Sequence, residues 1–270
     1  MHYLSWNATH RLNFSFFESV TFKGKDSTNF AAFDFQYINP VVFYLPVNFS
    51  VGSPGKMHLG MGASYNFFDR YKLYGQFLLG EFVIKEFIGG RGWWGNKYGF
   101  QLGLQSSDPF RLAGLHLLAE ANMVQPYTYS HSNTLTNYGY EMQPLAHPFG
   151  ANFIEGLIEA KYYHNKNIFS LTIIHAVSGL DSAGVDYGQN IYRNYTQRPS
   201  DYGIKLLQGL RSNYTAFNLS YSRLLIPKWD LTIAAGVNGS YTKTTNLGQL
   251  ENYFYISLKT LLNNDESFIH

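Results

Sequence analysis

Aromatic and hydrogen-bonding side chains gather in two stretches of this 270-residue chain, "RGWWGNKY" (91–98) and "QPYTYSHSNTLTNYGYEMQPLAHPFG" (125–150). Carbohydrate recognition places aromatic rings against the apolar faces of sugars, with carboxylates and amides on the hydroxyl groups. The candidates for polysaccharide binding are therefore Arg91, Trp93, Trp94, Tyr127, Tyr129, His131, Tyr138 and Tyr140. The alternative is that these rings form a belt at a membrane interface or fold inward as a plug.

Other chemistries find little support in the sequence. The chain has no Cys, which excludes disulfides, thiolate metal sites and cysteine nucleophiles, and it has no GxSxG motif. Asp181 and Asp186 lack the spacing of an EF-hand or a calcium-binding repeat, and His147 shows no second His or carboxylate at ligand spacing. The net charge of +2, without a Lys/Arg cluster, does not indicate nucleic-acid binding. We predict a protein that is not an enzyme and that holds no metal or cofactor.

The elements that position these residues are predicted to be β-strands. The stretch "KYGFQLGLQ" (97–105) alternates apolar and polar residues without a break, as a strand with one apolar and one polar face does. Similar alternation predicts eleven strands, at 2–9, 12–23, 57–66, 71–83, 97–107, 111–124, 151–164, 167–177, 211–225, 229–242 and 250–261. In the second of these, Phe16-Phe17-Glu18 breaks the pattern and indicates a β-bulge.

Two environments could suit such strands: the core of a soluble sandwich, or lipid outside an outer-membrane barrel. Only 14% of the residues are charged, against about 25% in ordinary soluble domains, and 18% are aromatic. Aromatic residues also crowd the predicted strand ends, as in the girdles of membrane barrels: Trp6, Tyr71, Phe110, Tyr127, Tyr162 and Trp229.

The connections between the predicted strands alternate in length. Tight turns fall near residues 10–11, 68–70, 108–109, 165–166 and 226–228, and the longer loops are 24–56, 84–96, 125–150, 178–210 and 243–249. This order is typical of an outer-membrane barrel, with tight periplasmic turns and long extracellular loops. We therefore expect the apolar faces to meet lipid and the polar faces to line a lumen. Lumen residues expected to pair across adjacent strands are Lys72, Lys97, Glu120, Glu155, Glu159 and Lys161.

Antiparallel strands cross the membrane in alternating directions, so a chain of eleven strands has its two ends on opposite sides and one of them lies outside the cell. Single-chain bacterial barrels instead have an even number of strands. The first residues, "MHYLSWNATH", also lack the features of a signal peptide. We therefore expect residues 1–270 to be one transmembrane domain that is the C-terminal part of a larger barrel.

Several stretches resemble the Wzi-type capsule assembly proteins of the outer membrane, in the branch from Bacteroidetes that is labelled gliding-motility RemB-like. They include "DFQYINPVVFYLPVNFSVGS" (34–53), "LYGQFLLGEF" (73–82), "WWGNKYGFQLGL" (93–104), "NMVQPYTYSH" (122–131), "NYGYEMQPLAHPFGANFIE" (137–155) and "DYGQNIY" (186–192). The resemblance implies a monomeric barrel of about eighteen strands that binds and attaches capsular polysaccharide at the cell surface, or supports adhesion and gliding.

The expected function is therefore the binding of surface polysaccharide through long loops, with outer-membrane lipid as the other partner. Two rival hypotheses stay open. One is a porin-like channel, which would conduct ions in planar bilayers. The other is a soluble, secreted β-protein, which would need no detergent.

Overall fold

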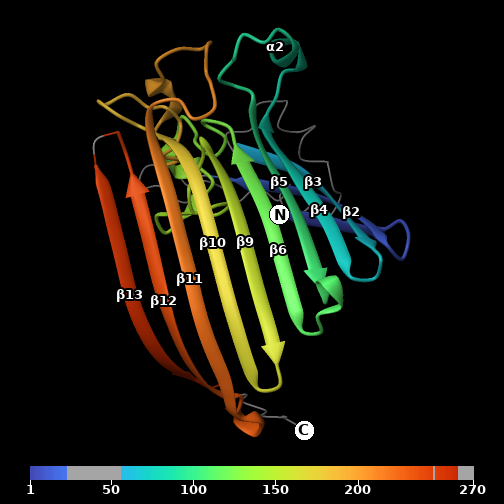
Figure 1. Cartoon of the computed structure of the whole chain (residues 1–270). Helices are drawn as coiled ribbons and strands as arrows, with labels where there is room; N and C mark the ends of the chain where they lie inside the picture. The colour runs from blue at the N-terminus through green and yellow to red at the C-terminus, as the bar shows by residue number, and fades with distance from the viewer. Residues whose placement is uncertain (23–55, 246, 261–270) are drawn as a thin grey trace, which may run out of the picture.

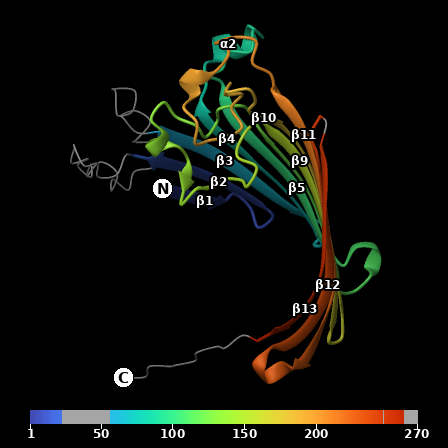
Figure 2. The same ribbon diagram turned by 90° about the vertical axis from the view of Figure 1, so that its left-hand side faces the viewer.

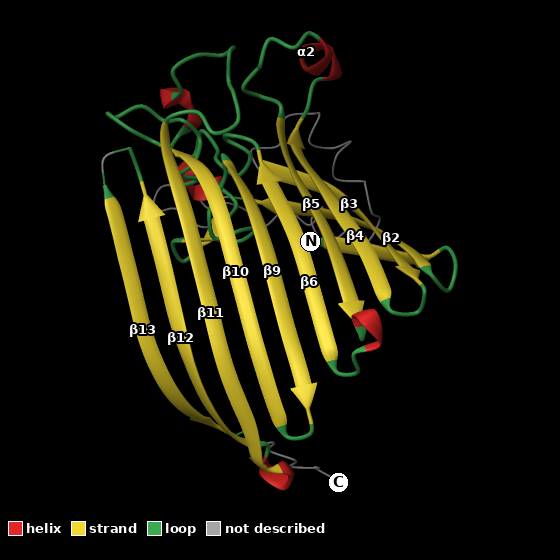
Figure 3. Cartoon of the chain, in the orientation of Figure 1, coloured by secondary structure: helices red, strands yellow, loops and turns green. Residues whose placement is uncertain are grey.

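A computed structural model describes residues 1–22, 56–245 and 247–260, and it contains one eleven-stranded antiparallel sheet (Figures 1 and 3). The strands lie side by side in chain order, each hydrogen-bonded to its neighbours in the sequence. They are β1 His2–Asn7, β2 Leu12–Thr21, β3 Lys56–Phe67, β4 Tyr71–Glu81, β5 Lys97–Ser107, β6 Leu115–Val124, β9 Phe153–His164, β10 Asn167–Leu180, β11 Leu210–Ile226, β12 Leu231–Lys243 and β13 Gly248–Lys259. The predicted all-β fold and all eleven strands are confirmed.

Three strands, β6, β9 and β12, begin later than predicted, and for β6 and β12 the reason is a short 3-10 helix in the preceding turn. Before β6, Pro109–Arg111 forms one of these helices, and the Asp108 carboxylate accepts a hydrogen bond from the Gly114 amide at 2.7 Å. Before β12, Pro227–Trp229 forms the other. Proline is favoured at the start of such helices because it has no amide hydrogen to leave unpaired.

The β-bulge predicted at Phe16-Phe17-Glu18 is wrong. β2 pairs with β1 and β3 in an unbroken register through these residues. Phe17 faces inward with its ring over Gly60, whose missing side chain leaves the space that the ring needs. A register shift occurs instead between Leu79 and Glu81 in β4, and it places Glu81 opposite Lys97 of β5.

The two ends of the sheet differ as the alternating connection lengths predicted. The tight turns lie at one end, and the longer connections 82–96, 125–152, 181–209 and 244–247 lie at the other (Figure 1). We call these the turn end and the loop end. The predicted loop 24–56 lies outside the described residues, apart from Lys56. Three loops contain short elements of their own. These are helix α2 Ile84–Ile88, the 3-10 helix Thr134–Thr136, the hairpin of β7 Gly139–Tyr140 with β8 Gln143–Pro144, and the 3-10 helix Tyr195–Gln197.

The sheet is strongly curved, and the loops lie over its concave face at the loop end (Figure 2). Its edges are β1 and β13, which do not pair with each other, so the described strands form an open sheet. Within the described residues, no helix combines the length and hydrophobicity needed to cross a membrane.

The two faces of the sheet have the opposite polarity to that of a soluble sandwich. On the convex face, Phe100 and Leu102 of β5 are 43% and 44% exposed, and Leu219 of β11 is 53% exposed. On the concave face, polar and charged side chains are buried, including Lys97, which is 0% exposed, and Glu155. Soluble proteins rarely expose rows of large apolar side chains on one face of a sheet while they bury charged side chains on the other.

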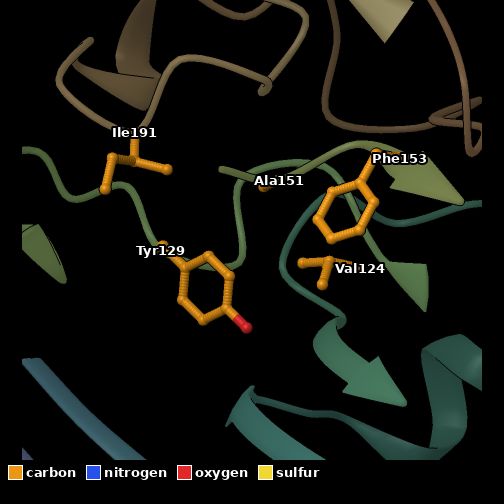
Figure 4. Close-up of a cluster of buried hydrophobic side chains, with 5 residues drawn as sticks. All are labelled: Val124, Tyr129, Ala151, Phe153 and Ile191. Carbon is orange, nitrogen blue, oxygen red and sulfur yellow. The ribbon is translucent and has the colours of Figure 1, made fainter. Parts of the chain in front are cut away.

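A small hydrophobic cluster packs between the loops and the concave face. It joins Val124 and Phe153, at the loop ends of β6 and β9, to Tyr129 and Ala151 and to Ile191 of the 181–209 loop (Figure 4). The cluster fixes both long loops onto the sheet and so positions the residues described next.

Candidate functional site

Two loops that are far apart in the sequence pair with each other at the loop end. The amides of Gly203 and Ile204 donate to the carbonyls of Arg91 and Gly92 at 2.8 and 3.0 Å, and the Trp94 amide donates to the Asp201 carbonyl at 3.0 Å. Gly92 has φ +64°, and a Cβ added there would lie 2.6 Å from the Ile204 carbonyl oxygen. The close approach of the loops therefore requires glycine at this position.

A cavity of about 210 Å³ lies beside this pairing, and we call it the loop cavity. It combines aromatic rings with one carboxylate and two amides. The lining residues are Glu86, Phe87, Gly90, Gly92, Trp93, Trp94, Asn96, Tyr98, Gln125, Pro126 and Ile204. Aromatic rings beside carboxylate and amide groups are the chemistry that a sugar needs.

The carboxylate of Glu86 is held at this cavity by groups from both loops. Its Oε2 lies 3.0 Å from Nη2 of Arg91, and the hydroxyl of Tyr202 donates to Oε1 at 3.4 Å. The Arg91 guanidinium lies 4.6 Å from the centre of the Tyr202 ring. Arg91 therefore neutralises Glu86 while most of its own side chain stays exposed.

The two tryptophans have different roles in the structure. Trp94 is half-buried, as Trp93 is, but other groups already contact its ring: Lys97 Nζ lies 4.4 Å from the ring centre, Arg198 Cζ 3.9 Å away and the Tyr195 ring 4.7 Å away. Cation–π contacts therefore occupy the Trp94 ring. Trp93 contacts Trp94 edge to face at 6.3 Å and lies over Gly95, so it is the tryptophan better placed to receive a ligand.

Buried cations hold the 125–150 loop against the sheet. Lys56 Nζ donates to the carbonyls of Thr128 and Ser130, both at 2.6 Å, and Lys97 Nζ lies 2.9 Å from Glu81 Oε1. The register shift in β4 turns Glu81 toward Lys97 and so makes this pair possible.

A second cavity, of about 260 Å³, lies between the 125–150 loop and the concave face, and we call it the sheet cavity. It combines side-chain amides with tyrosine rings and His147. Its lining residues are Met1, Tyr3, Phe17, Gln76, Leu78, Gly99, Phe100, Gln101, Asn122, Val124, Tyr129, Tyr138, Ala146, His147 and Phe153.

A hydrogen-bond network borders the sheet cavity. Asn122 Nδ2 donates to Glu120 and to Glu155, both at 2.9 Å, and Tyr74 donates to Glu120. His147 Nε2 lies 2.9 Å from Glu155 Oε2. This pair forms because the 144–153 segment folds back over the start of β9, where Glu155 lies.

The predicted sugar-binding residues thus divide between two cavities. Arg91, Trp93 and Trp94 belong to the loop cavity or its rim, and Tyr129 and Tyr138 belong to the sheet cavity. The other three candidates, described next, line neither cavity.

Tyr127 is fully buried and donates from its hydroxyl to the Asp186 carbonyl at 2.8 Å, so it reaches neither a ligand nor an interfacial girdle. Burial raises the pKa of this phenol above its usual range. His131 contacts Tyr195 and accepts from the Asn133 amide at 3.1 Å, and burial lowers the pKa of this imidazole. Tyr140 is exposed on β7.

The predicted lumen residues all lie on the concave face, but they form fewer cross-strand ion pairs than expected. Lys97 pairs with Glu81 across β4 and β5, whereas Lys161 pairs at 2.8 Å with Glu159 of its own strand. Glu120 and Glu155 bond to Asn122, as described above. Lys72 lines a cavity of about 480 Å³ at the turn end, together with His10, Arg11, Asn66, Asp69, Arg70, Tyr71, Gln105 and Ser107.

Asp181 and Asp186 fold the 181–209 loop onto itself. Asp181 Oδ1 accepts from the Tyr187 amide at 2.7 Å, and Asp186 Oδ1 accepts from the Gly188 amide at 2.8 Å. Asp186 is 0% exposed. Burial raises the pKa of its carboxyl to about 6, with a contribution from the negative charge of Asp181.

Sequence reasoning missed the polar residues of both cavities. In the loop cavity these are Glu86 and Gln125, whereas Asn96 belongs to the stretch "RGWWGNKY" that the sequence singled out. In the sheet cavity they are Gln76, Gln101 and Asn122, which occupy inward positions of correctly predicted strands. Gln76, Gln101 and Asn122 lie side by side because of the register between their strands. This register depends on the exact geometry of the turns, which the alternation of residues does not give. Nothing in the sequence indicates that residues 91–94 meet residues 201–204.

Comparisons of this chain with models of protein families, with curated proteins and with solved structures found no match. The functional argument therefore rests on the geometry of the sheet and its two cavities.

Proposed function

We propose that this chain forms part of the wall of a bacterial outer-membrane β-barrel, which binds a surface polysaccharide at its loop end. The observation that carries the proposal is the polarity of the sheet: the convex face exposes its apolar side chains, and the concave face buries polar ones beneath the loops. Lipid is the solvent that stabilises such a convex face. Further strands paired with β1 and β13 would close the barrel, which we propose to be monomeric.

The loop cavity is the proposed polysaccharide site. Trp93 provides a ring for stacking on a sugar, and Asn96, Gln125 and Glu86 provide hydrogen-bonding groups around it. The resemblance to Wzi-type capsule assembly proteins suggests capsular polysaccharide as the ligand, and its gliding-motility branch suggests a role in adhesion. Both stay predictions. In this proposal the protein binds its ligand and catalyses no reaction.

A pair of neighbouring substitutions tests the membrane part of the proposal. Leu219 and Ser220 are adjacent in the middle of β11 but lie on the convex and concave faces. Leu219→Arg places a charge in lipid and should destabilise the folded protein in vesicles by about 2–4 kcal/mol, whereas Ser220→Arg should change stability little. Urea unfolding in lipid vesicles measures both. Equal stability of the two variants would refute a lipid-facing convex surface and favour a soluble β-protein.

A second pair of substitutions tests the polysaccharide site. Loss of an aromatic stacking contact costs about 1 kcal/mol, so Trp93→Ala should weaken glycan binding roughly five- to tenfold, and Trp93→Phe should weaken it less. Trp229→Ala removes an exposed ring at the turn end and serves as the control. Binding is measured on arrays of bacterial surface glycans. Unchanged binding in Trp93→Ala would exclude the loop cavity as the site.

The porin alternative makes a different prediction. The 125–150 loop lies over the concave face and is anchored by Lys56 at two carbonyls, which favours a plugged lumen. We therefore expect the protein to show no stable conductance in planar bilayers. Open channels would support the porin instead.

A further inference from the structure

The floor of the sheet cavity is a row of polar side chains on four neighbouring strands. Gln76 of β4 pairs in register with Gln101 of β5, Gln101 pairs with Asn122 of β6, and Asn122 pairs with Glu155 of β9. Neighbouring strands lie about 4.8 Å apart, so the amides follow one another at that spacing. Hydroxyl groups around one pyranose ring span similar distances.

The amides of this row have unused hydrogen-bonding capacity. Within the described part of the chain, the side chains of Gln76 and Gln101 make no hydrogen bond, although each carries two donors and an acceptor. Asn122 uses its amide nitrogen on Glu120 and Glu155, which leaves its oxygen as an acceptor. Three adjacent amides can therefore both donate to and accept from hydroxyl groups.

Aromatic rings form the opposite wall of the sheet cavity. The rings of Tyr129 and Tyr138 stack at 5.8 Å with an interplanar angle of 26°, and His58 supports Tyr138 at 4.5 Å. The Tyr129 hydroxyl lies close to the sheet at Gly99, where an added Cβ would be in ordinary van der Waals contact with it at 3.5 Å. The cavity therefore has an amide floor and an aromatic wall, which suits a polyhydroxylated ring.

The charges at the cavity favour an uncharged ligand. Two carboxylates, Glu120 and Glu155, border the floor, and among the lining residues the groups that can carry a positive charge are the His147 side chain and the α-amino group of Met1. A uronic acid or a phosphorylated sugar would place its negative charge near both carboxylates, at a cost in free energy. A neutral sugar avoids this repulsion.

We propose that the sheet cavity binds one neutral sugar residue, with its hydroxyl groups on Gln76, Gln101 and Asn122 and its apolar face toward Tyr129 and Tyr138. This site is separate from the loop cavity and would bind a second unit of the same glycan or a branch of it. The proposal rests on the proposed function for the class of ligand, but it uses different residues.

The test measures binding of four proteins to an array that carries neutral and uronic-acid-containing oligosaccharides. They are the wild type, Gln101→Leu, Trp93→Ala and Gln105→Leu. Gln105 is the matched control, because it occupies the same face of β5 but lines the turn-end cavity. Loss of one or two hydrogen bonds predicts about tenfold weaker binding of neutral glycans by Gln101→Leu and no change for Gln105→Leu.

The outcomes separate the two proposals. If Trp93→Ala loses binding while Gln101→Leu matches the wild type, the sheet-cavity proposal is overturned and the proposed function stands. If Gln101→Leu loses binding while Trp93→Ala matches the wild type, the sheet cavity is supported and the loop cavity is excluded. A wild type that binds only uronic-acid-containing glycans overturns the neutral-sugar proposal, and a wild type that binds no glycan overturns both. A Gln105→Leu variant that weakens as much as Gln101→Leu would also overturn the sheet cavity.

Discussion

Asn152, which lines neither cavity, is predicted to hold the 181–209 loop in place. It is fully buried directly before β9. Its Nδ2 donates to the carbonyls of Gly179 at 2.7 Å, Gln208 at 2.9 Å and Tyr187 at 3.2 Å, and its Oδ1 accepts from the Leu207 amide at 2.7 Å. One side chain therefore joins both ends of the loop to the sheet.

The size of the effect follows from these bonds. Nδ2 carries two hydrogens, which its three carbonyl partners share, so these contacts count as two full hydrogen bonds. With the bond to Oδ1 this gives three buried hydrogen bonds at about 1 kcal/mol each, and orphaned backbone partners add to the loss. Asn152→Ala should therefore destabilise the loop by about 3–4 kcal/mol. Part of this cost is backbone strain, because Asn152 has φ +55°, where Ala is less favourable than Asn or Gly. Asn152→Gly should cost about 1 kcal/mol less than Asn152→Ala.

Asn152→Asp should be the most damaging substitution, because a carboxylate would face three carbonyl oxygens without a hydrogen to donate. The measurement is hydrogen exchange of peptides from 181–209, where 3–4 kcal/mol corresponds to exchange about 10²–10³ times faster. Asn194→Ala serves as the control. It removes a local cap in the same loop, in which Asn194 Oδ1 accepts a hydrogen bond from the Thr196 amide at 2.9 Å. If Asn152→Asp exchanges no faster than Asn194→Ala, the anchoring role of Asn152 is refuted.

Three further predictions concern the loop end. Lys97→Met removes the ion pair to Glu81 and two cation–π contacts, and it should lower the free energy of opening of the 82–96 loop by about 2 kcal/mol. Hydrogen exchange in this loop should therefore be faster, and unchanged exchange would contradict the prediction. Gly92→Ala should separate the paired loops and abolish binding in the loop cavity, and a crystal structure of the variant with the pairing intact would exclude this reasoning. Asp186 has a folded pKa of about 6 against about 3.9 when unfolded, so the loop should be most stable below pH 4 and lose roughly 2–3 kcal/mol as the pH rises to 7. Urea unfolding at several pH values should show this slope in the wild type and lose it in Asp186→Asn, and equal slopes would disprove the assignment.

The strands were predictable because each one carries its own signal. Alternation in "KYGFQLGLQ" depends only on side chains two residues apart, and it places Gln101 and Leu102 on opposite faces without reference to any other strand. The start of β6 was less predictable, because the Asp108 carboxylate competes with strand pairing for the Gly114 amide. Local side-chain bonds of this kind shift strand ends by a few residues.

The cavities were only partly predictable, because they form where loops meet across long sequence separations. Aromatic composition drew attention to residues 91–98 and 125–150, both of which contribute lining residues to the cavities, but it treats every ring alike. Only the fold shows that Lys97 and Arg198 contact the Trp94 ring, that Tyr127 is buried, and that Trp93 lines a cavity. Contacts between residues far apart in the sequence, such as Trp94 with Arg198 and Tyr127 with Asp186, help to decide the roles of equivalent residue types.

The separation of the two cavities has a consequence for the function. Tyr127 lies in the sequence between Pro126, which lines the loop cavity, and Tyr129, which lines the sheet cavity. Its side chain is fully buried, and its ring centre lies 6.3 Å from that of Trp94. A solute that crossed the protein on this side would have to displace that packed layer, which a porin has no reason to build. A binding protein does have a reason, because a rigid partition allows each cavity to hold its own sugar residue without a path for leakage. The layer therefore favours two fixed binding sites over a channel.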